Sequence, residues 1–240
     1  MISIITINFN NARGLERTLN SISEQSYKKF ELILVDGKST DDFKNVVKNY
    51  ENIITKMISE PDRGISHAFN KGINMSKGDW LLFLNSGDYL FDRNTLYNIA
   101  CELDTNYDFI QCNVQVTDSN LQPLYIIPKY KGSKTHSMAH QGLLHNRNFF
   151  LKAGYFSESY KIAMDTDIEI RLKNVKTKYC DIILSCMPND GVSAKNIKRV
   201  LREDMACHLL NLNDKSVISI FLLYHWRLIK WFIKKIIKKG

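Results

Sequence analysis

The chain has 240 residues, of which 44% are hydrophobic and 24% are charged. This length predicts one large domain or two small ones, and this composition excludes disordered, collagen-like and low-complexity proteins. The formal charge is +8, but six of the lysine and arginine residues lie between positions 227 and 239, which leaves residues 1–225 with only +2. The basic character belongs to the C-terminal end, which argues against a globally basic protein that binds nucleic acid.

The five cysteines are scattered, and none stands in a Cys-x-x-Cys pair. This pattern argues against a secreted disulfide framework and against a zinc ribbon, and it fits a reducing compartment. The first residues lack the basic region of a signal peptide, and no apolar stretch reaches the roughly 18–20 residues that span a bilayer. We therefore expect a cytoplasmic protein.

Strand and helix patterns alternate in the first half of the chain. The expected strands are Ile2–Phe9, Phe30–Val35, Ile53–Ile58 and Trp80–Leu84. Between them, Leu15, Leu19 and Ile22 share one helical face, a second helix is capped by Ser39 or Thr40, and a third covers Gly64–Met75. Continuous apolar strands separated by helices predict a mainly parallel sheet that is covered on both faces.

The second half is more irregular. The expected elements are a helix at Asn94–Leu103, strands at Phe109–Thr117 and Leu124–Ile127, a polar stretch at Lys129–His145, helices at Asn148–Ala153 and Thr166–Leu172, a strand at Tyr179–Cys186 and a helix at Lys195–Leu212. The chain contains no repeat and no linker. We expect one α/β domain over residues 1–212, with halves 1–90 and 91–212, and a helical tail over residues 213–240.

Polar residues follow three of the expected strands, at Thr6–Asn10, Asp36–Thr40 and Asn85–Asp88. Any one of these segments could simply be a turn. Ligands, however, bind at the carboxyl ends of parallel strands, and three such segments at one edge favour a nucleotide site. No Gly-x-Gly-x-x-Gly follows the first strand, and a P-loop would need glycine at position 32, where leucine stands.

Four blocks of the sequence resemble a known family. They are SIITINFN, LERTLNSISEQSYKKFELILVDGKSTDDF, ISEPDRGISHAFNKGI and GDWLLFLNSGDYL. They are similar to the nucleotide-sugar half of family 2 glycosyltransferases with the GT-A fold, closely over residues 1–90 and more loosely at 140–142 and 163–167. The resemblance implies a single GT-A, Rossmann-like domain.

The resemblance also implies a donor site and a cation. It assigns the nucleotide sugar to Thr6, Asn8, Asn10, Asp36, Asp62 and Asn85. The FLNSGD block takes the place of the family's Asp-x-Asp motif, with Asn85 and Gly87 where many relatives have aspartate, so Asp88 is the one carboxylate left to carry Mn²⁺ or Mg²⁺. Mg²⁺ often uses only one or two carboxylates plus substrate phosphates. The alternative is that Asp88 only closes a turn.

Asp165 falls where the family places its catalytic base, which takes the proton of the acceptor hydroxyl. The alternative is that Asp165 caps the helix Thr166–Leu172. Asp167 and Glu169 are further candidates, although Asp167 stands four residues before Arg171 and is expected to form an ion pair with it.

The expected function is that of an inverting glycosyltransferase using a UDP-sugar. His140 and Gln141 resemble a polar pair near the acceptor cleft of the family. The expected acceptor is a polyprenyl-diphosphate-linked saccharide of bacterial O-antigen, capsule or exopolysaccharide synthesis. One alternative is a nucleotidyltransferase. A glycine-rich, basic loop after the first strand would favour it, but Asn8–Gly14 holds only Arg13 and one glycine. The other is a non-catalytic scaffold at a membrane surface.

The tail carries an apolar stripe and a basic stripe at helical spacing. The apolar stripe contains Leu222, Trp226, Ile229, Ile233 and Ile236, and the basic residues are Arg227, Lys230, Lys234, Lys235, Lys238 and Lys239. The alternatives are a helix packed on the domain and a short coiled coil. Six cations without an acid favour a basic amphipathic helix that lies on an anionic membrane, here the inner face of the cytoplasmic membrane.

Overall fold

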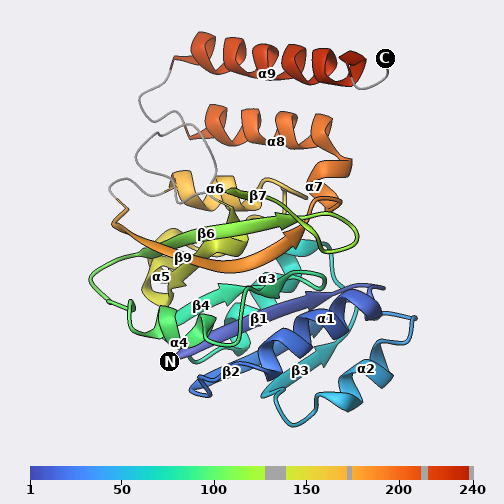
Figure 1. Ribbon diagram of the computed structural model, residues 1–240. Coiled ribbons are helices and arrows are strands. Elements are labelled where there is room, and N and C mark those ends of the chain that lie inside the picture. The colour runs from blue at the N-terminus through green and yellow to red at the C-terminus, as the bar shows by residue number, and fades with distance from the viewer. Residues whose placement is uncertain (128–138, 172–174, 212–215, 238–240) are drawn as a thin grey trace.

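The computed structural model describes residues 1–127, 139–171, 175–211 and 216–237. Its strands are β1 Ile2–Asn8, β2 Phe30–Asp36, β3 Lys56–Ser59, β4 Trp80–Phe83, β5 Tyr89–Leu90, β6 Phe109–Thr117, β7 Pro123–Ile127, β8 Leu143–Asn146 and β9 Thr177–Pro188. Its helices are α1 Ala12–Ser23, α2 Phe43–Asn49, α3 Ile65–Met75, α4 Thr95–Ala100, the 3-10 helix η1 His140–Gly142, α5 Arg147–Ala153, α6 Met164–Arg171, α7 Val192–Lys195, α8 Ile197–Leu210 and α9 Val217–Ile237. Within these residues the strands form one sheet in the order β3-β2-β1-β4-β8-β6-β9-β5, with β7 paired to β6 (Figure 1).

Strands β1 to β4 form the parallel part of the sheet. Ile2 lies opposite both Phe30 and Trp80, and β3 runs parallel to β2. One face of these strands packs against α1 and α2, and the other face packs against α3. Since both faces are covered, nearly every residue of β1, β2 and β4 is buried, and β4 is wholly apolar. The predicted α/β architecture is confirmed.

The second half makes the sheet mixed. β8 lies antiparallel between β4 and β6, and β9 runs parallel to β6. All residues of Leu143–Asn146 are buried, so the prediction of a polar stretch over Lys129–His145 is wrong at its C-terminal end, where β8 lies. Residues 128–138 of that stretch lie outside the described residues. A single core extends from β1 and α3 through β6 to α6 and α8.

The start of α2 differs from the prediction. The helix begins at Phe43 after Asp42, and neither Ser39 nor Thr40 caps it. The physical reason is that the Ser39 hydroxyl and amide are already bonded to Asp36. A side chain that closes a turn after β2 is therefore not free to cap the helix that follows.

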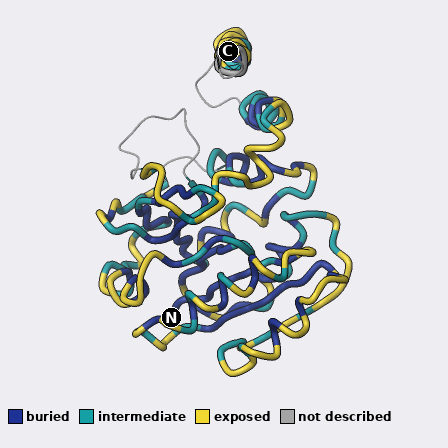
Figure 2. The backbone as a smooth tube through the Cα atoms, turned by 45° about the vertical axis from the view of Figure 1, so that its right-hand side comes forward, coloured by how far each residue is buried: buried dark blue, intermediate teal, exposed yellow. Residues whose placement is uncertain are grey.

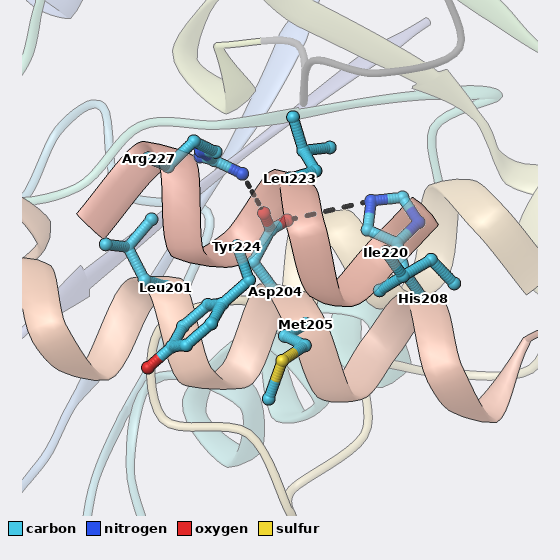
Figure 3. Close-up of a pocket in the computed structure, with 8 residues that line it drawn as sticks. All are labelled: Leu201, Asp204, Met205, His208, Ile220, Leu223, Tyr224 and Arg227. Atoms are coloured by element: carbon cyan, nitrogen blue, oxygen red, sulfur yellow. Dashed lines mark hydrogen bonds and ion pairs between the residues drawn. The ribbon is translucent and has the colours of Figure 1, made fainter. Parts of the chain in front are cut away.

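Helices α8 and α9 stack outside the sheet, at the top of Figure 1. Ile220 is buried against α8, and Arg227 pairs with Asp204 of α8 (Figure 3). Buried residues are concentrated in the sheet, whereas many residues of α9 are exposed (Figure 2). No helix in the described part of the chain is long and apolar enough to cross a membrane. The domain boundary expected at residues 212–213 falls outside the described residues.

Candidate functional site

A buried hydrogen-bond network joins the carboxyl ends of β1, β2 and β3. Oδ1 of Asp36 accepts from Nδ2 of Asn8 at 2.9 Å and from the Ser39 hydroxyl at 2.6 Å. Oδ2 accepts from the Ser39 amide at 2.9 Å and from the Ser59 hydroxyl at 2.7 Å. Burial by itself raises the pKa of this carboxyl, but these hydrogen bonds outweigh burial and hold the pKa below its ordinary value. Asp36 therefore orders this edge of the sheet.

More exposed groups surround that network. The Asn10 side chain accepts from the Thr40 amide at 2.8 Å, and Asp62 accepts from the Gly64 amide at 2.8 Å. A Cβ atom on Gly37 would lie 2.6 Å from a carboxylate oxygen of Asp62 and 3.0 Å from the ring of Phe9. Glycine at position 37 thus lets both side chains approach the backbone, and the Phe9 side chain itself is 66% exposed.

The loop after β4 is held by a threonine of α1. The Thr18 hydroxyl donates to the carbonyl of Asp88 at 2.6 Å and accepts from the Gly87 amide at 3.0 Å. Gly87 has a φ of +109°, a conformation that favours glycine. The backbone conformation of this loop therefore accounts for glycine at position 87.

The Asp88 carboxylate is buried, and one of its oxygens has no hydrogen-bond partner. It is 7% exposed, and burial raises its pKa to about 7, opposed by hydrogen bonds from the side chains of Gln141 and Asn85. Oδ2 of Asp88 and Oδ1 of Asn85 are buried without a hydrogen-bond partner. Two hard oxygen atoms of this kind fit Mg²⁺ or Mn²⁺, provided that substrate phosphates and water complete the shell. No cluster of three or more acidic, histidine or cysteine side chains suits a metal in the described residues.

The two parts of the edge are joined to each other. Nδ2 of Asn11 donates to the Ser86 carbonyl at 2.9 Å, and the Ser86 hydroxyl donates to the Ile7 carbonyl at 2.9 Å. The structure therefore brings Asn8, Asn10, Asp36, Asp62, Asn85, Asp88 and Gln141 to one edge of the sheet. Thr6 differs, because its side chain is fully buried inside β1 and its hydroxyl oxygen has no partner.

His140, which was expected near the acceptor cleft together with Gln141, is a buried residue. Its side chain is only 6% exposed and packs against the rings of Phe69, Phe83 and Phe156. Burial lowers its pKa to about 4, and neither ring nitrogen has a hydrogen-bond partner. Its neighbour Gln141 contacts Asp88.

Asp165 is the second residue of α6. The helix begins at Met164, so Asp165 is not its N-cap, although Oδ1 accepts from the Thr166 amide at 2.8 Å. Burial raises the pKa of this carboxyl to about 6, and the negative charge of Asp204 adds to the rise. A carboxylate with a pKa near neutrality is a suitable general base.

Two further acidic residues lie on α6. Asp167 forms the predicted ion pair with Arg171 at 2.7 Å, and the pair is partly buried. Glu169 lies one turn beyond Asp165 on the same helix.

The segment before α6 is tied to the half of the chain that carries the strand edge. The Asn70 side chain of α3 makes two hydrogen bonds with the backbone of Phe156, and Nζ of Lys161 donates to the Arg63 carbonyl at 2.7 Å. Within the described residues, no hydrogen bond or ion pair joins Asp165 to Asp36 or to Asp88. The structure thus places α6 beside the half that carries those groups.

Sequence reasoning missed three residues of this region. Two of them could have been found from the sequence pattern. Thr18 is the polar residue in helical phase with Leu15 and Ile22, and Phe9 is an aromatic residue at a strand end. Glu203 of α8 accepts from three backbone amides just before α6. It had no signal, because its partners lie about forty positions earlier in the chain.

A family model described as "Glycosyl transferase family 2" matches residues 3–169. A PGL/p-HBAD biosynthesis glycosyltransferase of Mycobacterium tuberculosis is 28% identical over 193 residues, which cover 77% of this chain and 75% of that protein. An uncharacterized glycosyltransferase of Rickettsia typhi is 28% identical over 219 residues, which cover 85% and 69%.

Solved structures share the fold. S. aureus TarS 1-349 in complex with UDP-GlcNAc matches with a TM-score of 0.68 and 18% identity, over 94% of this chain and 72% of that one. The mannosyltransferase PcManGT from Pyrobaculum calidifontis, in complex with GDP-Man and Mn²⁺, matches with a TM-score of 0.69 and 17% identity, over 93% and 69%. At these identities the likeness is one of fold.

Proposed function

The chain belongs to glycosyl transferase family 2 and is a glycosyltransferase, and from this premise we propose that it transfers a sugar, with inversion, from a UDP-sugar to a lipid-linked saccharide. The observation that carries the proposal is the polar edge at the ends of β1, β2 and β4. There the Asn8–Asp36 network and the Asn85–Asp88 loop are joined through Asn11 and Ser86.

The donor nucleotide is proposed to bind over this edge. Phe9 is exposed beside Gly37 and offers a flat surface for stacking of a base. Asp62 and Asn10 supply polar atoms around it. Asn8 and Asp36 are proposed to support the site, because the hydrogen bond between them holds the strand ends in place.

Asp88 is proposed to hold Mn²⁺ or Mg²⁺, with Asn85 as a neutral neighbour. When bound, such a cation would lower the negative charge that accumulates on the departing diphosphate. The role of the chain is to keep the Asp88 carboxylate fixed: Thr18 holds its backbone, and Gln141 donates to its side chain.

Asp165 is proposed as the general base for a single displacement. The acceptor oxygen forms a bond to the anomeric carbon while the bond from that carbon to the diphosphate oxygen breaks, and UDP leaves with the bonding electrons. The proton of the acceptor hydroxyl passes to Asp165. An α-linked donor then gives a β-linked product.

Helix α9 supports the proposal of a membrane-bound acceptor on the inner face of the cytoplasmic membrane. Leu222, Trp226 and Ile229 are exposed on the side away from α8, and Lys230 lies 3.4 Å from the Trp226 ring centroid. Arg227 is an exception to the expected basic stripe, because it is paired with Asp204. An exposed apolar face with neighbouring cations fits an anionic lipid surface. The proposed acceptor is therefore a polyprenyl-diphosphate-linked saccharide.

The test is a panel of UDP-sugars and GDP-mannose, with Mn²⁺, Mg²⁺ or EDTA. Nucleotide release is measured with and without a polyprenyl-diphosphate-sugar analogue. We expect ion-dependent UDP release that increases when the acceptor is added. Release of GDP alone would refute the UDP assignment, and pyrophosphate release from a nucleoside triphosphate would indicate a nucleotidyltransferase.

A further inference from the structure

Glu203 of α8 binds the backbone just before α6. One carboxylate oxygen, Oε2, accepts from the amides of Lys161 at 3.0 Å, Ile162 at 2.8 Å and Ala163 at 3.1 Å. The first amides of a helix have no partner within the helix and are stabilised by a negative charge. These three amides lie just before Met164, the first residue of α6, so Glu203 fixes from another helix the backbone that leads into α6.

The carboxylate of Glu203 is itself fixed. Its other oxygen accepts from Nε of Arg199 at 2.8 Å, and its side chain is only 13% exposed. Burial by itself raises the pKa of this carboxyl, but the hydrogen bonds from Arg199 and from the three amides outweigh burial and lower the pKa. These hydrogen bonds therefore favour the ionised form of Glu203.

The segment that Glu203 holds is gripped on its other side by α3 and the turn before it. Nζ of Lys161 donates to the Arg63 carbonyl, and the Ser66 hydroxyl donates to the Tyr160 carbonyl at 3.2 Å. Asp165 follows Ala163 by two residues. Its position is thus set by a short segment clamped between α8 and α3.

We propose that Glu203 is the positioning residue for the base, which orients Asp165 by holding the amides of Lys161, Ile162 and Ala163. This inference rests on the proposed role of Asp165 as base. Misplacement of a catalytic group by about 1 Å costs up to about 10²-fold in rate. Glu203 is not itself a catalytic residue, because its oxygens are occupied by the backbone and by Arg199.

The test compares Glu203→Ala and Glu203→Gln with the matched control Arg199→Ala, which leaves the three backbone hydrogen bonds in place. The assay is UDP release from the donor that the panel identifies. We expect Glu203→Ala to lower kcat about 10- to 100-fold while the donor KM and the Kd for UDP with Mn²⁺ change less than about twofold. Glu203→Gln retains an acceptor oxygen and should lose less. Arg199→Ala removes only one contact of the Glu203 carboxylate and should therefore lower kcat less than Glu203→Ala does.

A double-mutant cycle distinguishes positioning from general support of the fold. In an Asp165→Asn background, Glu203→Ala should lower kcat no further, because the group it positions is gone. Equal losses in both backgrounds, a parallel rise in donor KM, or wild-type kcat in both Glu203 variants would overturn the inference. Wild-type kcat in Asp165→Asn alone would instead refute the base, and so the proposed function, independently of Glu203. If Glu203→Ala does not fold, Glu203→Gln carries the same cycle.

Discussion

The Asp165 carboxylate tests the proposed chemistry most directly. Asp165→Asn keeps the shape of the side chain and an oxygen for the Thr166 amide, but it cannot accept a proton. We expect kcat to fall roughly 10²- to 10⁴-fold while UDP binding, measured by calorimetry, is retained. Glu169→Gln on the same helix is the control. Loss of turnover in the control, together with full activity in Asp165→Asn, would assign the base to Glu169.

The pH profile tests the same residue in the wild-type enzyme. Burial, and then the charge of Asp204, raises the pKa of Asp165 to about 6. A base acts when deprotonated, so kcat, measured with saturating donor and Mn²⁺ to suppress the titration of Asp88, should be level above this pKa and fall about tenfold per pH unit below it. A rate that is constant between pH 5 and pH 8 would show that no group with this pKa takes the proton.

Asp88 has the one carboxylate of its loop. Asp88→Asn keeps the size of the side chain and removes its charge, so UDP binding should lose its dependence on Mn²⁺. Asn85→Ala should weaken it less, because a neutral amide oxygen adds little to the affinity for a hard cation. Titration of UDP with and without Mn²⁺ measures both, and UDP affinity in EDTA is the control. Turnover that survives chelation in the wild type would remove the cation from the mechanism.

At the scale of elements, hydrophobic periodicity predicted those helices and strands whose burial follows from the pattern of their own residues. The phase of Leu15, Leu19 and Ile22 located α1, and continuous apolar runs located β1, β2 and β4. The strand β8 was missed because it contains His145 and Asn146, two polar residues that are buried. Their burial depends on strands β4 and β6 on either side, which a local pattern does not contain.

The candidate site was likewise predictable where it depends on local motifs and not where it depends on distant contacts. The resemblance grouped Asn8, Asp36 and Asp88 from short motifs, and the structure brings them to one edge. What the sequence could not predict is how Asp36 is used, since its partners lie on three different strands or turns. Glu203 and Arg227 were likewise hidden, because their partners lie about forty and 23 positions away in the chain, beyond the range of a local pattern.

The exposed face of α9 makes a prediction about membrane binding. Leu222→Ala with Ile229→Ala removes apolar surface and leaves every charge in place. At about 1 kcal/mol or more for each truncated side chain, partition onto anionic vesicles should fall at least tenfold. Sedimentation with vesicles at low and high salt measures it, because screening weakens the basic contribution.

Leu151→Ala is the matched control for α9, since Leu151 is 75% exposed on α5. It should bind vesicles like the wild type. Equal binding by the control and the α9 double variant would show that α9 is not the lipid-binding surface. Turnover on a short soluble acceptor should be unchanged in both, because neither side chain contacts the proposed site.

Across the whole molecule, the two halves meet at an aromatic cluster that contains two buried histidines. His145 of β8 packs against Phe83 of β4 and Phe109 of β6, and its ring lies 5.3 Å from that of His140. Burial, and then the neighbouring His140, lowers the pKa of His145 well below its ordinary value. Both imidazoles are therefore neutral in the folded protein.

This cluster predicts how stability depends on pH. Below about pH 6.5 the unfolded chain protonates His145, whereas the folded chain does not, so the folded state loses stability as pH falls. Asp88 and Asp165 act in the opposite direction, because their raised pKa values let the folded state bind protons first, between about pH 7 and the ordinary range. The two effects offset each other in the wild type, and removing one histidine should expose the difference.

His145→Phe places a ring of similar shape in the aromatic cluster and removes the titration. The free energy of unfolding of this variant minus that of the wild type should be about 2 kcal/mol more positive at pH 5 than at pH 7.5, since one protonation with a pKa of about 6.5 is eliminated from the unfolded state. Urea unfolding of both proteins at the two pH values measures how the effect of the substitution changes with pH. Any packing cost of the new ring is the same at both pH values and therefore cancels. Phe43→Leu, a core substitution on α2 that removes no titratable group, should shift stability equally at both pH values. If His145→Phe does the same, then burial does not lower the pKa of His145 in the folded protein.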